Sequence, residues 1–285
     1  MLRGLYTAGT AMIAQSRRMD VVTNNLVNVE TAGYKSDTLV TQSFRDMMIS
    51  RLNDPSIYQY SFVGPHNTGI HIDTITTEFQ NGPLLETQNP TDLAIDGDAF
   101  FVVEFTPVTQ IPPTAEELED PDFEPEYEEG EMEYRYTRAG NFNVDGEGYL
   151  VTPTGYYVLD QDGERIEVGT SVFDVDRSGV ISVDGEEITR LWTVRFEDNN
   201  VLRKAGENLY TVAPLLDEDG EPLEIEPETV EDVTVLQNYL EGSNVNAARE
   251  TVLMMETYRA YEINQRIIHI IDESLGRAVN DIAKI

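Results

Sequence analysis

The stretch whose residue types come closest to a binding chemistry is residues 174–179, which read DVDRSG. Carboxylates at the first and third positions and a glycine at the sixth match the start of an EF-hand calcium loop. That loop needs a bidentate glutamate at its twelfth position, where this chain has Gly185. We therefore interpret the stretch as a β-hairpin with an aspartate-rich turn, and we predict no metal site.

The histidines give no sign of catalysis either. A zinc pair of His66 and His71 lacks further ligands at a recognisable spacing. The third histidine, His269, lies within the apolar run IIHII, where a packing position is expected rather than a proton-transfer role. The histidines therefore indicate neither a metal site nor a general base.

Other catalytic patterns are missing from the sequence. With 53 acidic residues, paired carboxylates arise by chance and indicate nothing about acid–base catalysis. The chain has no cysteine, which excludes a thiolate nucleophile and a disulfide framework. It also has no glycine-rich phosphate loop and no G-x-S-x-G elbow. We predict a protein that is not an enzyme and has no cofactor.

The charge is distributed unevenly. The formal net charge is −34, which makes nucleic acid an unlikely partner. Residues 1–45 carry a net charge of +2 and residues 240–285 carry −2, so residues 46–239 hold the whole excess. Near-neutral ends suit burial against other copies of the chain, because stacked like charges in a desolvated contact are costly.

The N-terminal segment has a helical pattern. Leu5, Met12, Met19 and Leu26 recur at steps of seven, which predicts an amphipathic helix over residues 3–29. The pattern stops at residues 28–33, where Gly33 can adopt the left-handed conformation that ends a helix.

The C-terminal segment repeats this pattern. Its step-of-seven positions are Ala247, Met254, Tyr261, Ile268, Leu275 and Ile282. Ser243 and Asn244 are expected to cap a helix that runs to Ala283. No segment approaches the roughly 20 apolar residues of a membrane span, and no cleaved signal peptide is evident, so no membrane insertion is predicted.

The middle of the chain has a strand pattern instead. Short apolar segments are joined by Asp-Gly turns at residues 96–97, 145–146 and 184–185, which predicts an all-β unit. Two acidic tracts, residues 106–134 and 217–232, contain no base and are expected to form solvated loops or hairpins.

Both ends also carry motifs that resemble those of flagellar rod and hook proteins. Residues 23–35 read TNNLVNVETAGYK, close to the pattern ANNLANxxTxG[YF]K of that family, and they follow a similar start, MLRGLY. Residues 240–246 read LEGSNVN and residues 255–264 read METYRAYEIN, which resemble the family's C-terminal signature. Further likeness lies in DLAIDGDAFF at 92–101, YTRAGNF at 136–142 and AGENLY at 205–210.

The resemblance implies an α+β fold, with N- and C-terminal helices forming a coiled-coil-like axial domain and a central all-β domain. We accordingly divide the chain into an N-terminal axial helix and motif (1–35), an extended connector (36–80), a β-rich central domain (81–239) and a C-terminal axial helix (240–285). The terminal segments are expected to be disordered before assembly and to fold on joining the polymer.

The resemblance also implies a function and partners. It predicts a structural subunit of the bacterial flagellar rod, of the distal or the proximal rod, that forms a hollow helical homopolymer and transmits torque from motor to hook. Its partners would be other copies, other rod and hook subunits and the flagellar type III export apparatus, and its location would be the basal body, outside the cytoplasm.

The residues expected at the assembly interface come from the two helices and their motifs. They are Leu5, Met12, Met19, Asn24, Asn25, Leu26, Asn28, Gly33, Tyr34, Asn244, Met254, Arg259, Tyr261, Glu262, Asn264, Ile268 and Leu275.

Two alternatives remain open. A hook protein belongs to the same family but usually has a longer chain with an extra domain. A secreted acidic calcium-binding or adhesive β protein is suggested by the acidic tracts and Asp-Gly turns. Calcium titration of the 36–239 fragment distinguishes the second, because tight stoichiometric binding would support it.

Overall fold

The structure is a computed structural model that describes residues 2–51, 61–110, 127–130, 132–169, 173–213, 215–216, 222–223, 227–230 and 232–282. The chain divides into two compact units. Unit 1 comprises residues 1–29, 36–78 and 245–285, and unit 2 comprises residues 30–35 and 79–244. The fold is α+β, with a helix at each end of the chain and a β-rich middle, as the sequence predicted.

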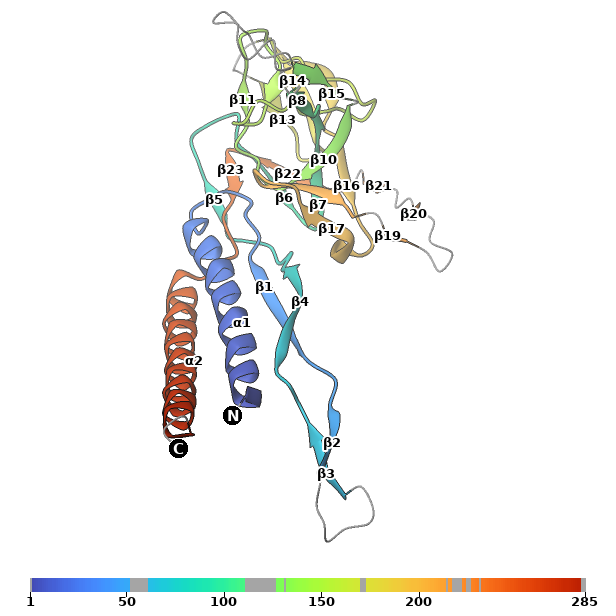
Figure 1. Ribbon diagram of the computed structural model, residues 1–285. Helices are drawn as coiled ribbons and strands as arrows, with labels where there is room; N and C mark the ends of the chain where they lie inside the picture. Colours follow the sequence, from blue (N-terminus) through green and yellow to red (C-terminus); the bar gives the residue numbers. More distant parts are fainter. Residues whose placement is uncertain are drawn as a thin grey trace, which may run out of the picture. The chain divides into compact units, whose positions relative to one another are not determined.

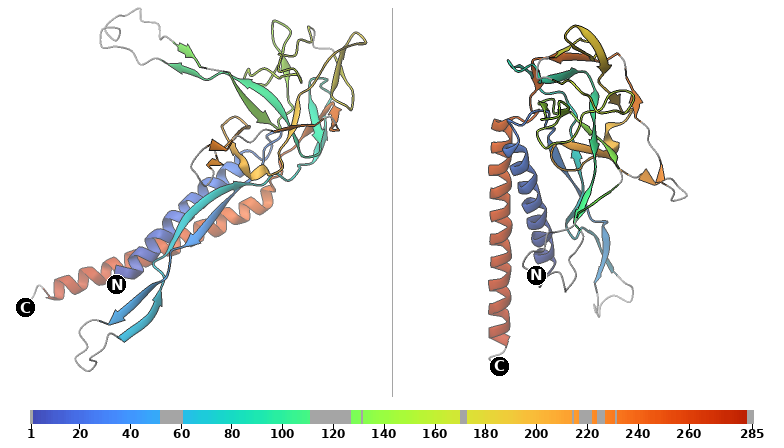
Figure 2. Two further views of the ribbon diagram at one scale, coloured as in Figure 1. Left: turned by 90° about the vertical axis from the view of Figure 1, so that its right-hand side faces the viewer. Right: turned by 90° about the horizontal axis from the view of Figure 1, so that it is seen from above.

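Unit 1 contains both helices. They are α1 (Leu2–Val27) and α2 (Ala247–Ile282), and they lie side by side and antiparallel (Figures 1 and 2). Asn25 approaches Glu250 near one end of the pair, and Gly4 faces Ile271 near the other. These two contacts are 21 residues apart in each helix, so one uninterrupted register runs along the pair.

The helix ends differ in detail from the prediction. Asn28 donates from Nδ2 to the Asn24 carbonyl at 2.8 Å as α1 ends. Gly33 has the expected left-handed φ of 67°, but it lies six residues beyond the last residue of α1 and does not cap it. At α2 the N-cap is Asn246, whose Oδ1 accepts from the Arg249 amide at 3.1 Å, so the expected cap at Ser243 and Asn244 is wrong.

Unit 1 also contains a long β arm. Its strands are β1 (Asp37–Ser43), β2 (Met47–Arg51), β3 (Ser61–His66) and β4 (Ile70–Thr77). Strand β1 pairs antiparallel with β4, and β2 pairs antiparallel with β3. The segment expected as an extended connector is thus extended, but its two halves pair with each other as a ribbon (Figure 1).

The described part of unit 2 is built from short strands and includes a 3-10 turn. They are β5 (Leu84–Glu86), β6 (Leu93–Asp96), β7 (Ala99–Phe105), β8 (Val108–Gln110), β9 (Tyr127–Glu129), β10 (Glu133–Thr137), β11 (Asn143–Val144), β12 (Leu150–Val151), β13 (Asp174–Val175), β14 (Val180–Val183), β15 (Glu186–Arg190), β16 (Thr193–Arg195), η2 (Asn199–Val201), β17 (Leu202–Lys204), β18 (Leu209–Val212), β19 (Leu215–Leu216), β20 (Pro222–Leu223), β21 (Glu228–Thr229), β22 (Thr234–Gln237) and β23 (Tyr239–Glu241). The largest sheet is antiparallel in the order β17-β18-β10-β7-β16-β21.

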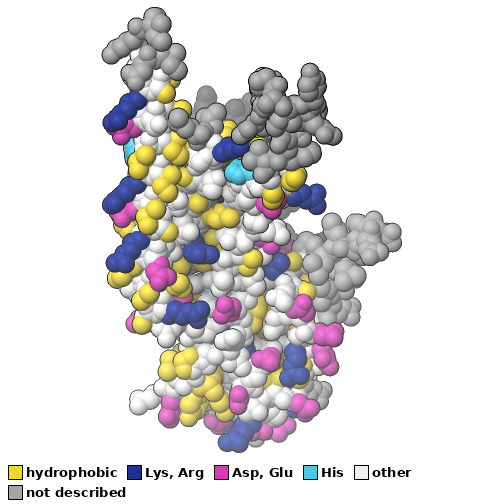
Figure 3. All heavy atoms as spheres, turned by 90° about the horizontal axis from the view of Figure 1, so that it is seen from below, with side chains coloured by type: hydrophobic (Ala, Val, Ile, Leu, Met, Phe, Trp, Pro, Cys, Tyr) yellow, Lys and Arg dark blue, Asp and Glu magenta, His cyan; other side chains and the backbone are white. Residues whose placement is uncertain are grey.

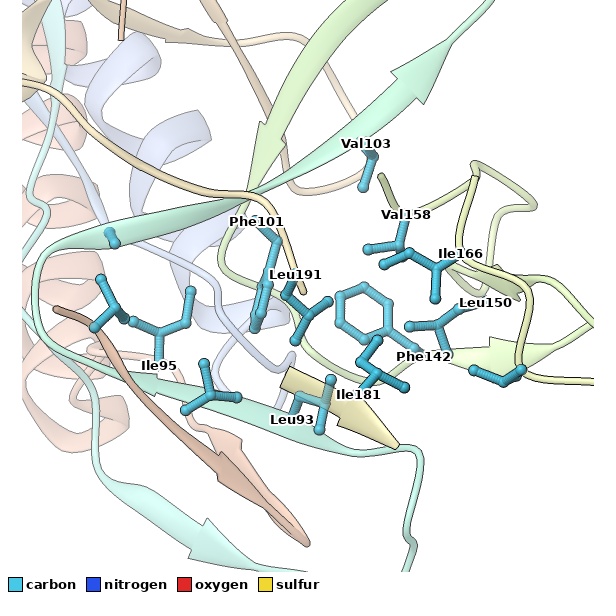
Figure 4. Close-up of a cluster of buried hydrophobic side chains, with 14 of the residues drawn as sticks. Leu93, Ile95, Phe101, Val103, Phe142, Leu150, Val158, Ile166, Ile181 and Leu191 are labelled. Atoms are coloured by element: carbon cyan, nitrogen blue, oxygen red, sulfur yellow. The ribbon is translucent and has the colours of Figure 1, made fainter. Parts of the chain in front are cut away.

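Strand β7 lies at the centre of unit 2 and is buried on both faces. Because side chains alternate between the faces of a strand, Phe101 and Val103 enter one hydrophobic cluster while Phe100 and Val102 enter another. The first cluster also contains Leu93, Phe142, Leu150 and Ile181 (Figure 4). A continuous apolar run in the sequence therefore reflects a strand with cover on both sides.

The turn predictions of the sequence are confirmed in unit 2. Asp184 and Gly185 have φ of 53° and 85° between β14 and β15, as a two-residue hairpin turn requires. Strands β13 and β14 pair antiparallel, so the calcium-loop lookalike is a hairpin. Asp176 caps its turn by accepting from the Arg177 amide and the Ser178 hydroxyl.

The acidic tracts are described only in part. Strands β8 and β9 pair at the base of the first tract, while residues 111–126 and 131 lie outside the described residues. In the second tract, residues 217–221, 224–226 and 231 lie outside them as well. Where the chain is described, no helix is long and apolar enough to cross a membrane.

Candidate assembly interface

Side chains of α1 are buried or half-buried within unit 1. Ala8, Ala14 and Val22 are 5%, 3% and 4% exposed. The step-of-seven residues are half-buried; on α1 they are Leu5, Met12, Met19 and Leu26.

The seam of α2 is arranged in the same way. Four predicted residues, Met254, Tyr261, Ile268 and Leu275, are half-buried and share one helix face, while Thr257 between them is buried. The predicted stripe residues of both helices are thus half-buried. The additional role between copies stays a prediction.

A second apolar row lies on the opposite face of α2. It consists of Val252, Met255, Ile263, Ile267 and Ile270, which are 39–65% exposed. Arg259, Arg266 and Arg277 lie on the same face by helical periodicity. Figure 3 shows hydrophobic side chains between Lys and Arg side chains along this edge of the molecule. An exposed apolar row framed by charges is typical of a surface that contacts another protein.

Asn25 makes its contacts within the chain. It is 2% exposed, its Nδ2 donates to the Asp37 carbonyl at 2.9 Å, and its Oδ1 accepts from the Asp37 amide at 2.9 Å. Its Nδ2 also lies 3.5 Å from Glu250 Oε2 on α2. The side chain therefore fastens α1 to the first residue of the β arm and approaches α2, a role that the sequence did not reveal.

The other predicted polar residues are spread along the helices. Asn24 and Asn28 interact at the end of α1, and Asn264 bonds the carbonyl one turn earlier, that of Ala260, at 3.0 Å. Arg259 is exposed and Glu262 is half-buried. These positions are compatible with contacts to a neighbouring copy, and those contacts remain a prediction.

Gly33 and Tyr34 belong to unit 2 rather than to the helix pair. A Cβ on Gly33 would overlap the backbone of Arg138 and Ala139, so no other residue fits there without movement. Tyr34 is 4% exposed, and its ring lies 4.0 Å from Lys204 Nζ. The end of the motif, residues 30–35, is thus a docking segment that packs within the β unit.

Three buried charges hold this docking segment. The residues Lys35, Glu241 and Arg138 are 1%, 2% and 3% exposed. Lys35 Nζ lies 2.6 Å from Glu241 Oε1, and Arg138 Nε lies 3.5 Å from Glu241 Oε2. We call these three residues the buried ion cluster.

Backbone groups complete the cluster. Lys35 donates to the Gln80 carbonyl at 2.8 Å, Glu241 Oε1 accepts from the Gly82 amide at 2.9 Å, and Arg138 donates to the Gly97 carbonyl. The Gly33 amide donates to the Glu241 carbonyl at 2.7 Å. The predicted interface residue Asn244 joins nearby, donating to the Gln80 carbonyl at 3.3 Å.

Burial shifts the pKa values of both cations in the cluster. It is the main cause that lowers the pKa of Lys35; Glu241 opposes this shift, and Arg138 adds to it. Burial likewise lowers the pKa of Arg138, again opposed by Glu241. Glu241 is therefore the counter-charge on which two buried cations depend.

The buried ion cluster was not predicted from the sequence. Each member lies inside a family-like motif, within two residues of a glycine: Gly33 before Lys35, Gly140 after Arg138 and Gly242 after Glu241. A charged residue close to a glycine in a β segment is the one feature of the sequence that could have indicated these buried charges. Pairing positions 35 and 241 needs the fold, because 206 residues separate them.

The described residues contain no group of three or more potential metal ligands among histidine, cysteine, aspartate and glutamate. Two paired terminal helices, an exposed apolar row on α2 and a β unit with its own hydrophobic core are typical of a structural protein that assembles with other chains.

Comparisons with known proteins specify the family. Family models match at both ends and in the middle: "Flagella basal body rod protein" over residues 5–35, "Flagellar hook protein FlgE/F/G D1 domain" over 126–183, and "Flagellar basal body rod FlgEFG protein C-terminal" over 236–281.

Relatives match over almost the whole chain. The flagellar hook-basal body complex protein FlhO of Bacillus subtilis is 31% identical over 288 residues, covering 100% of both chains. The flagellar basal-body rod protein FlgG of Buchnera aphidicola subsp. Acyrthosiphon pisum is 30% identical, covering 97% of this chain and 98% of its own. FlgF of Caulobacter vibrioides is 28% identical over 287 residues and covers 100% of both.

This chain belongs to the flagellar basal-body rod protein family. It is a structural subunit of the flagellar basal body, as the motifs at the two ends predicted.

Proposed function

We propose that the chain polymerises through its two terminal helices into a hollow helical rod that transmits torque from the motor to the hook. The observation that carries this proposal is the exposed apolar row on α2, on the face opposite the seam that packs on α1. Because each isoleucine of the row is already partly buried, covering the rest of it would contribute about 1 kcal/mol, roughly half the value for a fully exposed side chain. A structural role rather than a catalytic one is part of the proposal.

Coiled-coil-like packing is the mode that we propose for the helices. The step-of-seven residues of both helices are half-buried along one antiparallel register, which supports it. Outside the rod, the helix pair leaves much apolar surface in water. We therefore propose that the terminal segments order fully on assembly, where contacts with neighbours offset the lost conformational entropy.

We propose a position in the distal rod, with other copies, other rod and hook subunits and the type III export apparatus as partners. The likeness to proteins named FlgG, at 30% identity over 97% of the chain, supports a rod position over the hook alternative. No feature of the described residues favours the calcium-binding alternative.

The test combines deletion of the gene with electron microscopy of purified basal bodies. The length at which the rod stops gives the position of the subunit.

Complementation with Ile268→Asp or Met19→Asp should fail, because a carboxylate in the half-buried seam disrupts the helix pair, and the β unit should still fold. Rods of normal length with filaments in both variants would contradict the proposal. Ile188→Asp, at an exposed residue of unit 2, is the matched control and should complement.

A further inference from the structure

The α2 helix extends past the end of its partner. The contacts of Asn25 with Glu250 and of Gly4 with Ile271 place Leu2, the first residue of α1, opposite residue 273. The last nine residues of α2, from 274 to 282, therefore have no counterpart on α1. At 1.5 Å per residue this overhang is about 13 Å long.

The overhang continues the apolar seam. Leu275 and Ala278 follow Tyr261 and Ile268 on the face that packs on α1, and both are only half-buried. Val279 is 64% exposed beside them. Before residue 274, this face of α2 packs on α1 of the same chain. Because that α1 does not reach the overhang, an α1 helix of another copy is the matching surface for it.

Unit 1 has a groove at the start of α1. Arg3, Tyr6 and Thr10 line it from α1, and Phe44, His66 and Thr68 line it from the β arm, enclosing about 370 Å³. Tyr6 is 69% exposed and Phe44 is 38% exposed. The Nε2 atom of His66 is buried and makes no hydrogen bond with the described residues. The groove thus combines apolar walls with a polar atom that lacks a partner.

One pair of opposite charges suits a contact between the two surfaces. The overhang, residues 274–282, contains Arg277 and Asp281, and Arg277 already pairs with Glu273 of its own helix at 2.6 Å, while the groove is lined by Arg3 and His66 and by no acid. The C-terminal end of a helix also carries a partial negative charge, which adds to the attraction.

We propose that the overhang of α2 in one copy occupies the groove between α1 and the β arm in a second copy. This inference rests on the proposed polymerisation and specifies the contact. It is heterologous, since two different surfaces meet, so it repeats from copy to copy without closing. Val279 lies six positions before the start of α1 in its own copy, and so ten positions before Tyr6. Placing it against Tyr6 of the neighbour therefore staggers adjacent copies by about 15 Å along the helix axis.

The absence of cysteine permits a direct test by cross-linking. The double variant Thr68→Cys/Val279→Cys replaces the native chain in the cell, and basal bodies are purified and oxidised. A head-to-tail contact gives a ladder of dimers, trimers and longer chains, whereas each single variant stays monomeric. The two positions are about 15 Å apart along the axis within one copy, too far for an intrachain disulfide. Ile188→Cys/Val279→Cys is the control, and its dimer yield should be at least tenfold lower.

Charge exchange provides the second measurement. Asp281 lies level with position 4 of the neighbour's α1 in this stagger, next to Arg3, and far from Arg3 of its own chain. Asp281→Arg or Arg3→Glu, introduced into the double-cysteine chain, should therefore reduce the ladder at least fivefold, and combining the two should restore at least half of it. Dimers from Val279→Cys alone, or a ladder insensitive to both charge changes, would overturn the contact while leaving the rod role intact. Basal bodies that lack the chain altogether would overturn the rod role as well.

Discussion

Unit 2 and the helix pair of unit 1 bury their apolar side chains to different degrees. In unit 2, Leu93 and Phe101 are 0% exposed, and the aromatic rings of Phe101 and Phe142 pack edge-to-face with centroids 5.1 Å apart. On α2, Ile263 and Ile270 are 57% and 65% exposed. The β unit therefore completes its core within one chain, whereas the helix pair leaves apolar side chains of α2 exposed, as is typical of a surface that contacts another protein.

The same contrast applies to the charged groups. Unit 2 buries the ion cluster of Lys35, Glu241 and Arg138, while the ion pair of α2, Glu273 with Arg277, is 65% and 76% exposed. A buried pair is costly to break, and an exposed pair contributes little. Substitutions in the two regions should therefore have separable effects on stability and on assembly.

The largest expected loss of stability follows Glu241→Gln. This change leaves two buried cations without a counter-charge and should lower the free energy of unfolding of unit 2 by about 3–5 kcal/mol. Urea unfolding followed by the fluorescence of Trp192, the single tryptophan, measures it. The control Glu133→Gln removes the partly exposed pair with Arg135 and should cost less than about 1 kcal/mol. Equal losses in both variants would mean that the cluster is not a special site.

Gly33→Ala should have the next largest effect. The left-handed φ of 67° costs roughly 1–2 kcal/mol for alanine. Overlap of the new Cβ with the backbone of Arg138 and Ala139 adds about 1–3 kcal/mol. The control Gly155→Ala shares a positive φ of 93° but meets nothing within 4 Å, so it isolates the cost of the conformation. If the two variants lose the same stability in urea, the close approach at Gly33 is not energetically important.

Ile270→Gln should have the smallest effect on the isolated chain. Because Ile270 is already exposed, its replacement should change the free energy of unfolding by less than about 0.5 kcal/mol, as measured by the helical circular dichroism signal. Ile181→Val, in the buried core, should cost about 0.5–1.5 kcal/mol. A loss at position 270 that equals or exceeds the loss at 181 would indicate that the row on α2 is covered within one chain.

Local patterns in the sequence were sufficient to predict the elements. The steps of seven from Leu5 to Leu26 and from Met254 to Leu275 predict both helices, and the Asp-Gly pair at 184–185 predicts a hairpin turn that the structure contains. These signals depend on neighbours in the chain, so no tertiary information is needed.

Features that depend on distant partners were not predictable in this way. Asn25 belongs to a motif that is identified with assembly, yet its side chain bonds Asp37 within the same chain. The pairing of the two halves of segment 36–78 was missed because its apolar alternation is weak and its pairing joins residues up to 40 positions apart, as for Asp37 with Thr77. The pairing of Lys35 with Glu241 was not predicted, since a single sequence does not show which acid faces which base.

The buried ion cluster also affects the order in which the chain can fold. Lys35 is near the start of the chain and Glu241 is near its end. The two side chains therefore cannot pair until nearly all of the polypeptide has emerged. In a chain that emerges with its N-terminus first, Lys35 has no partner for its charge until Glu241 has emerged, so this part of unit 2 stays unfolded until then. Only α2 then remains to emerge, so the β unit closes just before α1 gains its helical partner.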